Sequence, residues 1–269
     1  MKFVEPTVYL LAKSCVDQQE ARRWLDELDA TGYDIPAQCS NAELLTTLAG
    51  KRCYMSFEPG LNPNVTRVRQ DMVAFIENIL ASRHGSVLEH SSYTFALEHV
   101  SRVFTAELNR HRAGWAISEG SLRYIRFTDI PVWLPFSIRA DEADAPELSA
   151  AKTRTREVFI RAFQQMEENY RELEEIWHID ALQSFQEKKK LTSMMRRIIG
   201  MGVATGGVWT GNLRALRHVL AVRVDAAAEE EIAYVFGLVL QRMIAEEPSI
   251  FADFEQTDDG FWTPTYWKV

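Results

Sequence analysis

Chemistry-bearing side chains gather in one stretch of the sequence, residues 83–127. Four of the six histidines lie there, and residues 101–126 hold five arginines against two glutamates, within a chain of formal net charge −8. Because a planar guanidinium binds phosphate oxygens in pairs, the stretch predicts a site for a phosphorylated small molecule. The alternative is a helix end whose charges are simply solvated. The histidines are His84, His90, His99 and His111.

The order of the residues favours a phosphate site. Residues 110–124 read RHRAGWAISEGSLRY and resemble RHRxxSxNExSxRY, the signature of the flavin-dependent thymidylate synthases. Both ends match, from Arg110 onward and from Glu119 to Tyr124. The centre departs: there is one extra residue, Trp115 stands near the expected serine, and Ser118 replaces the asparagine.

Further blocks resemble the same family. Residues 84–90, HGSVLEH, match the block that precedes the arginine motif, and residues 210–223, TGNLRALRHVLAVR, match a later helix. Arg196 stands where the family has a nucleotide-binding arginine, although a family proline is Gly200 here. The resemblance covers roughly residues 45–245, beginning near the tetrapeptide at Lys51.

The resemblance implies a methyltransferase that converts dUMP to dTMP with FAD, NADPH and methylenetetrahydrofolate. Arg223 would polarise the uracil ring, and Arg110 would touch both flavin and nucleotide. The flavin would contact Ser86, Glu89, Arg110, His111, Arg112, Glu119, Asn212, Arg214 and His218. The nucleotide would contact Glu107, Asn109, Arg110, Glu119, Ser121, Leu122, Arg123, Arg196 and Arg223.

A protein nucleophile is not evident. The three cysteines lie outside the arginine cluster, and Ser121 has no neighbouring base in the sequence. An unactivated hydroxyl is a weak nucleophile, so Ser121 is better interpreted as a hydrogen-bond donor to phosphate. No histidine spacing predicts a metal site. His84 and His111 fall in matched blocks, whereas His90 and His99 are expected to be structural.

The pattern of apolar residues predicts the elements that position these side chains. Strands are expected at 7–12 and 91–100, the second with Tyr93, Phe95 and Leu97 on one side. A helix is expected at about 67–82, capped by Asn64 or Thr66. Further helices are expected at about 19–28, 42–48, 146–177, 191–201, 211–224 and 226–246, the one at 146–177 carrying an apolar stripe from Val158 to Tyr170.

Helix geometry separates three of the site residues. Arg214 and His218 are four residues apart and share a face, whereas Arg223 lies about 180° around the helix from Arg214. One straight helix is therefore not expected to place all three in one pocket. The family resolves this with a homotetramer whose active sites are shared between subunits, and the resemblance implies the same here.

The fold class expected is α/β (α+β), a central largely antiparallel or mixed sheet with long helices. Residues 1–269 are expected to form a single domain whose C-terminal half, from about residue 145, is helical. The acidic net charge argues against a nucleic-acid partner. No signal peptide or membrane span is evident, so a cytoplasmic location is expected.

Two alternatives stay open. Relatives in nucleoside-antibiotic pathways methylate UMP, and the altered motif centre fits such a divergence. Glu107, where the family often has glutamine, could accept a hydrogen bond from a ribose 2′-hydroxyl. The other alternative is a non-catalytic flavin- or nucleotide-binding protein. The choice between dUMP and UMP, and the reductant, are not settled by the sequence.

Overall fold

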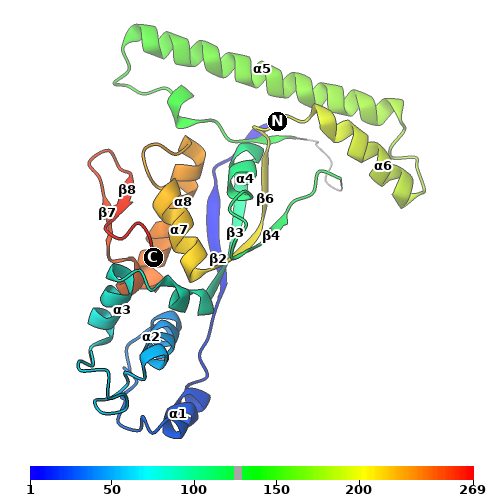
Figure 1. Ribbon diagram of the computed structural model, residues 1–269. Coiled ribbons are helices and arrows are strands. Elements are labelled where there is room, and N and C mark those ends of the chain that lie inside the picture. The colour runs from blue at the N-terminus through cyan, green and yellow to red at the C-terminus, as the bar shows by residue number, and fades with distance from the viewer. Residues whose placement is uncertain (124–128) are drawn as a thin grey trace. The chain divides into compact units, whose positions relative to one another are not determined.

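The computed structural model describes residues 1–123 and 129–269. The chain divides into two compact units (Figure 1). Unit 1 comprises Met1–Tyr9, Ala96–Arg110 and Ile117–Trp209, and unit 2 comprises Leu10–Phe95, His111–Ala116 and Thr210–Val269. Each unit therefore contains segments that are distant in the sequence.

Helices and strands are mixed along the described residues. The strands are β1 (Lys2–Phe3), β2 (Thr7–Lys13), β3 (Ser92–Ser101), β4 (Trp115–Glu119), β5 (Pro131–Val132), β6 (Ala204–Asn212), β7 (Phe254–Gln256) and β8 (Trp262–Pro264). The α-helices are α1 (Gln18–Glu27), α2 (Asn41–Tyr54), α3 (Met72–Ala81), α4 (Arg102–Leu108), α5 (Pro146–Ile176), α6 (Phe185–Met195), α7 (Leu213–Arg223), α8 (Glu230–Glu246) and α9 (Pro248–Phe251). Short 3₁₀ turns are η1 (Gly85–His90), η2 (Phe136–Ile138) and η3 (Arg196–Ile198).

The principal sheet has four strands in the order β2-β3-β6-β4. Backbone bonds join Asn212 to Gly114 and Gly120 to Gly206, so β4 and β6 run in opposite directions. The sheet is antiparallel, as the sequence predicts. The strand expected at 91–100 is β3, and the predicted alternation is confirmed because Tyr93, Phe95 and Leu97 are all buried.

Unit 1 is organised around an apolar cluster beneath the long helix α5. Met166 and Tyr170 from α5 pack with Val132, Met195 and Val203. Pro146 opens the helix at its first turn, where its missing N–H costs nothing. Val158 and Phe159 remain exposed, so the apolar stripe predicted along α5 is buried only toward its C-terminal end.

Unit 2 is organised around helices. η1 packs against α2 and α7, while α8 packs against α7 and α9. Helix α2 begins with a capping box in which Ser40 and Glu43 bond each other's backbone N–H groups, as the sequence pattern S-x-x-E favours. These contacts hold the block at 84–90 against the start of α7.

The glycine-rich strand β6 is absent from the sequence-based prediction. Its sequence, ATGGVWTGN, lacks the β-branched alternation that identifies strands. The structure explains the glycines by close approach, because a Cβ on Gly206 would lie 1.9 Å from the Glu98 carboxylate. The helix expected from residue 211 accordingly begins at Leu213.

Some predicted helix ends are also wrong. Helix α3 begins at Met72 rather than near residue 67, and its cap is Asp71 instead of Asn64 or Thr66. The helix expected at 191–201 is α6, which starts earlier at Phe185 and ends at Met195 in a 3₁₀ turn. Helix α8 starts at Glu230. In each case a local side-chain cap, which periodicity does not reveal, decides the boundary.

Among residues 1–123 and 129–269, no helix combines the length and apolar character needed to cross a membrane. Over the same residues, no group of three or more His, Cys, Asp or Glu side chains is arranged to hold a metal ion. The three cysteines, Cys15, Cys39 and Cys53, are free thiols.

Candidate functional site

The start of helix α7 forms a candidate site in unit 2. Asn212 caps the helix, accepting a hydrogen bond from the Ala215 N–H at 2.8 Å. Its own N–H donates to the Gly114 carbonyl at 3.0 Å. The cap orients the first turn of α7, whose dipole favours a bound anion.

The altered centre of the arginine motif is a tight turn against this helix. Trp115 N–H bonds the Arg112 carbonyl at 3.4 Å, and Gly114 adopts a left-handed backbone with φ +76°. A Cβ at Gly114 would lie 2.6 Å from the Asn212 amide and 2.7 Å from the Ala215 side chain. The extra residue thus belongs to a turn between α4 and β4 that requires glycine.

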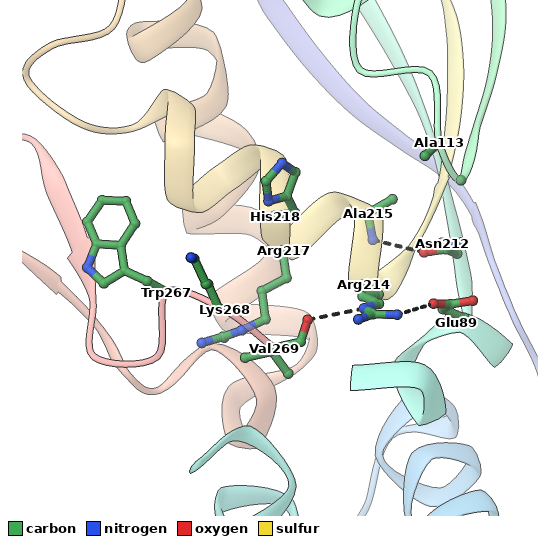
Figure 2. Close-up of a pocket in the computed structure, with 11 residues that line it drawn as sticks. Glu89, Ala113, Asn212, Arg214, Ala215, Arg217, His218, Trp267, Lys268 and Val269 are labelled. Atoms are coloured by element: carbon green, nitrogen blue, oxygen red, sulfur yellow. Dashed lines mark hydrogen bonds and ion pairs between the residues drawn. The ribbon is translucent and has the colours of Figure 1, made fainter. Parts of the chain in front are cut away.

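Arg214 is held from two sides. Its Nη1 bonds Glu89 at 2.6 Å and its Nε donates to the Val269 carbonyl at 3.1 Å (Figure 2). Arg214 and Glu89 are both about half exposed. The ion pair therefore sets the direction of the guanidinium while leaving it accessible to a ligand.

These residues line a cavity of about 520 Å³, a volume typical of small-molecule sites. Arg214 and His218 both face it, which confirms that they share one side of α7, and Arg223 is not part of its lining. Glu89 is the one carboxylate side chain in a lining that is otherwise cationic or neutral. The lining residues are Glu89, Ala113, Gly114, Asn212, Arg214, Ala215, Arg217, His218, Trp267, Lys268 and Val269.

His111 links the two sides of α7. Arg223 Nε donates to His111 Nε2 at 3.0 Å, so that nitrogen carries no proton. The His111 ring stands edge-on to the His218 ring, with centroids 6.2 Å apart. Arg223 and His218 thus contact the same imidazole, although Arg223 does not line the cavity.

A second candidate site, in unit 1, is a closed polar cluster centred on Glu119. Its carboxylate forms a short ion pair with Arg102 and accepts hydrogen bonds from Thr105 Oγ1 and Asn109 Nδ2, both at 2.9 Å. Asn109 Oδ1 in turn accepts from Trp209 Nε1 at 3.1 Å. Arg102 and Glu119 are 16% and 19% exposed. Glu119 thus acts as the hub that joins α4 to β4.

Positive charge accumulates around this cluster. The pKa of Arg102 lies below its usual range, chiefly because burial strips water from the guanidinium. The nearby charge of Arg196 lowers it further, while Glu119 opposes the shift. Arg196 is itself exposed. An anion arriving beside Arg196 would relieve repulsion between the two arginines.

The segment after β4 brings the predicted phosphate-binding residues toward the end of α6. Arg123 Nε donates to Ser193 Oγ at 3.1 Å, and Arg196 follows Ser193 by three residues on the same helical face. Ser121 Oγ accepts from the Arg123 N–H at 3.3 Å, which leaves its O–H to donate elsewhere. Leu122 packs against the unit 1 core, so only its backbone is available to a ligand.

The remaining predicted residues lie at the surface or outside the described part. Ser86, Arg110 and Arg112 are exposed, and Glu107 is half-buried on α4. Arg110 N–H bonds the Glu107 carbonyl at 3.3 Å, which places both at the end of that helix. Tyr124, the last residue of the signature, lies outside the described residues.

Several residues that form the Glu119 cluster and the α7 cavity were not identified from the sequence. Arg102, Thr105 and Asn109 have the helical spacing i, i+3 and i+7. They therefore form a polar stripe on one face, which helical periodicity could have identified. Only Asn109 was given a role. On the wall of the cavity, Trp267 belongs to a group of four aromatic residues at 261–267 that predicts packing on the rest of the protein but no site role, and Val269 carries no local signal. Their place depends on the tertiary fold.

Comparison with known proteins relates this chain to one family. Residues 35–249 match the family model described as thymidylate synthase complementing protein, Thy1. A flavin-dependent thymidylate synthase from Mycobacterium marinum is 31% identical over 229 residues, covering 83% of this chain and 85% of the relative. One from Corynebacterium efficiens is 29% identical over 260 residues, covering 94% and 91%.

A solved structure shares the fold. The UMP/dUMP methylase PolB from Streptomyces cacaoi, bound with 5-Br UMP, superposes with a TM-score of 0.63 at 18% identity, covering 93% of this chain and 94% of PolB. The residues that the family model matches run from the block at Glu89 through the arginine motif to helix α7, so they include most of the α7 cavity lining and the Glu119 cluster. The chain belongs to the flavin-dependent thymidylate synthase family.

Proposed function

We propose that this protein is a flavin-dependent methyltransferase that methylates C5 of a uracil nucleotide, converting dUMP to dTMP. The observation that carries the proposal is the cavity at the start of α7. The family's Asn-x-Arg and histidine positions line it together, as Asn212, Arg214 and His218. A capped helix start, an arginine and a histidine are suited to the pyrophosphate of a dinucleotide.

The cavity fits FAD in charge as well as in place. Its single carboxylate side chain, Glu89, is already paired with Arg214. When bound, the flavin supplies the redox chemistry, with methylenetetrahydrofolate as carbon donor and NADPH as reductant. The protein's own share is then binding, orientation and electrostatics.

The residues of unit 1 would hold the nucleotide. Ser121 would donate its O–H to a phosphate oxygen, while Arg123 and Arg196 would bind the phosphate charge. The Glu119 cluster would fix the strand that leads to Ser121, because three donors from α4 grip its carboxylate. Glu119 is thus proposed to position the nucleotide site through the backbone.

In unit 2, Arg223 would act on the uracil ring. Its contact with His111 orients the guanidinium through Nε, and the guanidinium would approach the ring's N3 and O4. A positive charge there stabilises negative charge on the pyrimidine as C5 becomes nucleophilic. Arg110, exposed at the end of α4, would touch both ligands.

UMP is the second candidate substrate. Glu107 replaces the amide that the family often has, and a carboxylate accepts a hydrogen bond from a 2′-hydroxyl more strongly. PolB, which shares the fold, is described as a UMP/dUMP methylase. If Glu107 reads the ribose, a Glu107→Gln variant will change the ratio of UMP to dUMP turnover, and an unchanged ratio would remove this role.

We also propose that the active protein is a homotetramer with shared active sites. Large apolar side chains stay exposed along α5 and α6, including Leu148, Val158, Ile176 and Phe185. Exposed apolar groups in such number mark an association surface. Light scattering on the purified protein tests the assembly, and a monomer at assay concentration that retains activity would disprove it.

The deciding experiment for the chemistry is direct. The purified protein should show a flavin spectrum and methylate a nucleotide when given methylenetetrahydrofolate and NADPH. Assays with dUMP and UMP side by side distinguish the two substrates. Flavin that NADPH bleaches, without product from either nucleotide, would indicate a flavoprotein of another function, and protein without flavin or product would contradict the proposal.

A further inference from the structure

The segment that follows β8 crosses the candidate flavin cavity, and it lies beyond residues 35–249, which the family model matches. Trp267, Lys268 and Val269 all line the cavity (Figure 2). A part of this chain that the family model does not include therefore completes a pocket built from the family's motif residues.

The segment is fixed firmly at its near end. The Tyr266 N–H donates to Asp253 Oδ2 at 3.0 Å, and the Tyr266 carbonyl accepts from Arg217 Nη2 at 3.2 Å. Arg217 is buried, forms an ion pair with Asp253 and packs over the rings of Phe251 and Phe254. A buried, multiply bonded arginine is costly to disturb, so Tyr266 is a rigid support.

The far end is seated on the motif residues. Val269 accepts the bond from Arg214 Nε at 3.1 Å and packs directly on Gly85. A Cβ at Gly85 would lie 2.2 Å from the Val269 carbonyl carbon. The glycine of the block at 84–90 thus makes room for this segment. Trp267 thus lies between two fixed residues, Tyr266 before it and Val269 two positions after it.

Trp267 itself presents an unusual surface. Its side chain is 47% exposed although it lines a cavity, so a large aromatic ring faces open space beside Arg214, His218 and the start of α7. An aromatic plane on one wall and cations on another match a ligand that combines a planar ring with phosphates. The two fixed ends set the ring in place before any ligand arrives, which reduces the entropic cost of binding.

We propose that Trp267 is a flavin-binding residue whose indole packs on a ring of the cofactor, and that the segment 267–269 forms a wall of the flavin site. This inference rests on the proposed function, because it takes the α7 cavity as the flavin site. The Val269 carbonyl has the supporting role of orienting Arg214 toward the cofactor's phosphates.

The test is the affinity for FAD, measured on apoprotein by titration. Trp267→Ala should weaken binding about tenfold, since aromatic stacking on a flat ring contributes on the order of 1 kcal/mol or more. Trp267→Phe should stay close to wild type because a flat ring is kept. The matched control is Trp177→Ala in unit 1, where an equally exposed tryptophan (46%) lies outside the cavity and should not alter affinity.

A second readout reports the contact itself. Indole stacked on isoalloxazine quenches flavin fluorescence, so flavin bound to Trp267→Ala should be brighter than flavin bound to wild type if the isoalloxazine is the ring involved. If Trp267→Ala binds FAD within twofold of wild type, the proposal is overturned while the proposed function stands. If the wild type does not bind FAD, both fall together.

Discussion

The Glu119 cluster of unit 1 and the α7 cavity of unit 2 are built from the same kinds of side chain but have different roles. In the cluster, an arginine and a glutamate are enclosed, and Glu119 accepts hydrogen bonds from Arg102, Thr105 and Asn109. At the cavity, Arg214 and Glu89 form the same type of pair with nearly half of each side chain exposed. The two ion pairs differ in how far they are enclosed, not in the types of residue that form them.

This difference has a physical meaning. An enclosed ion pair holds one backbone arrangement because breaking it strands a charge without water. An open ion pair contributes little to folding, since water replaces either partner at small cost. It can instead point a guanidinium at a ligand. The closed cluster therefore serves as the frame, and the open pair serves recognition.

The largest effect expected is on stability, from removing the carboxylate of each pair. Glu119→Ala should lower the free energy of unfolding by about 3 kcal/mol, because Arg102 is left charged and largely buried. Glu89→Ala is the matched control and should cost less than about 1 kcal/mol. Urea unfolding followed by circular dichroism measures both. Equal losses would contradict the distinction between frame and recognition.

The next effect is on flavin affinity. Arg214→Ala should raise the Kd for FAD about 30-fold, since hydrogen bonds to charged groups contribute roughly 1.5–3 kcal/mol. Folding should be nearly unchanged. The control is Arg242→Ala, an arginine of α8 that is likewise about half exposed and forms an ion pair with Glu246. An Arg214 variant that binds FAD as the wild type does would place the flavin elsewhere.

The sequence predicts the α7 cavity better than it predicts the Glu119 cluster. Arg214 and His218 share a face because the helical period is constant, so spacing alone placed them correctly. The Glu119 cluster is closed by Trp209 of β6, which bonds Asn109. Strand β6 was not recognised, because glycines such as Gly206 are selected by close packing against Glu98 rather than by strand propensity. The Trp267 wall likewise depends on contacts that no local pattern encodes.

The extra residue of the arginine motif gives the same lesson on a smaller scale. Its consequence could not be derived from the sequence, since a loop and a helix both accommodate one residue. In the structure, Gly114 takes a left-handed backbone and contacts Asn212, so the insertion is absorbed in a turn. Long-range contact with α7, not local preference, decides its conformation.

The third prediction separates nucleotide binding from flavin binding. Arg123→Ala should weaken dUMP binding about tenfold through loss of a charged hydrogen bond to phosphate, with the Kd for FAD unchanged. Arg197→Ala, an exposed arginine next to Arg196, is the control and should change neither affinity. Isothermal titration with each ligand makes the measurement. A parallel loss of FAD affinity would mean that Arg123 does not act on nucleotide binding alone, as proposed.

The smallest effect concerns Lys51, an enclosed cation in the same unit as the open cavity. It is fully buried, and its Nζ donates to the carbonyls of Arg69 at 2.6 Å and Ser56 at 3.3 Å, with the Phe75 ring centroid at 4.8 Å. Burial lowers the pKa of Lys51 from 10.5 to about 8. A neutral amine can keep both hydrogen bonds, so the protein does not need the charge.

The sign of the pH dependence follows from that shift. Between pH 8 and 10.5 the unfolded chain still binds the Lys51 proton while the folded protein has released it, so the free energy of unfolding rises with pH. Below pH 8 both states are protonated, and the full cost of burying the charge is present. From pH 8 to 9, wild type should gain about 1 kcal/mol relative to Lys51→Met, which keeps the apolar stem without a titrating group. A difference that does not change with pH would mean that Lys51 stays charged in the folded state, and that an enclosed cation here is held by its carbonyl partners as firmly as Arg102 is by Glu119.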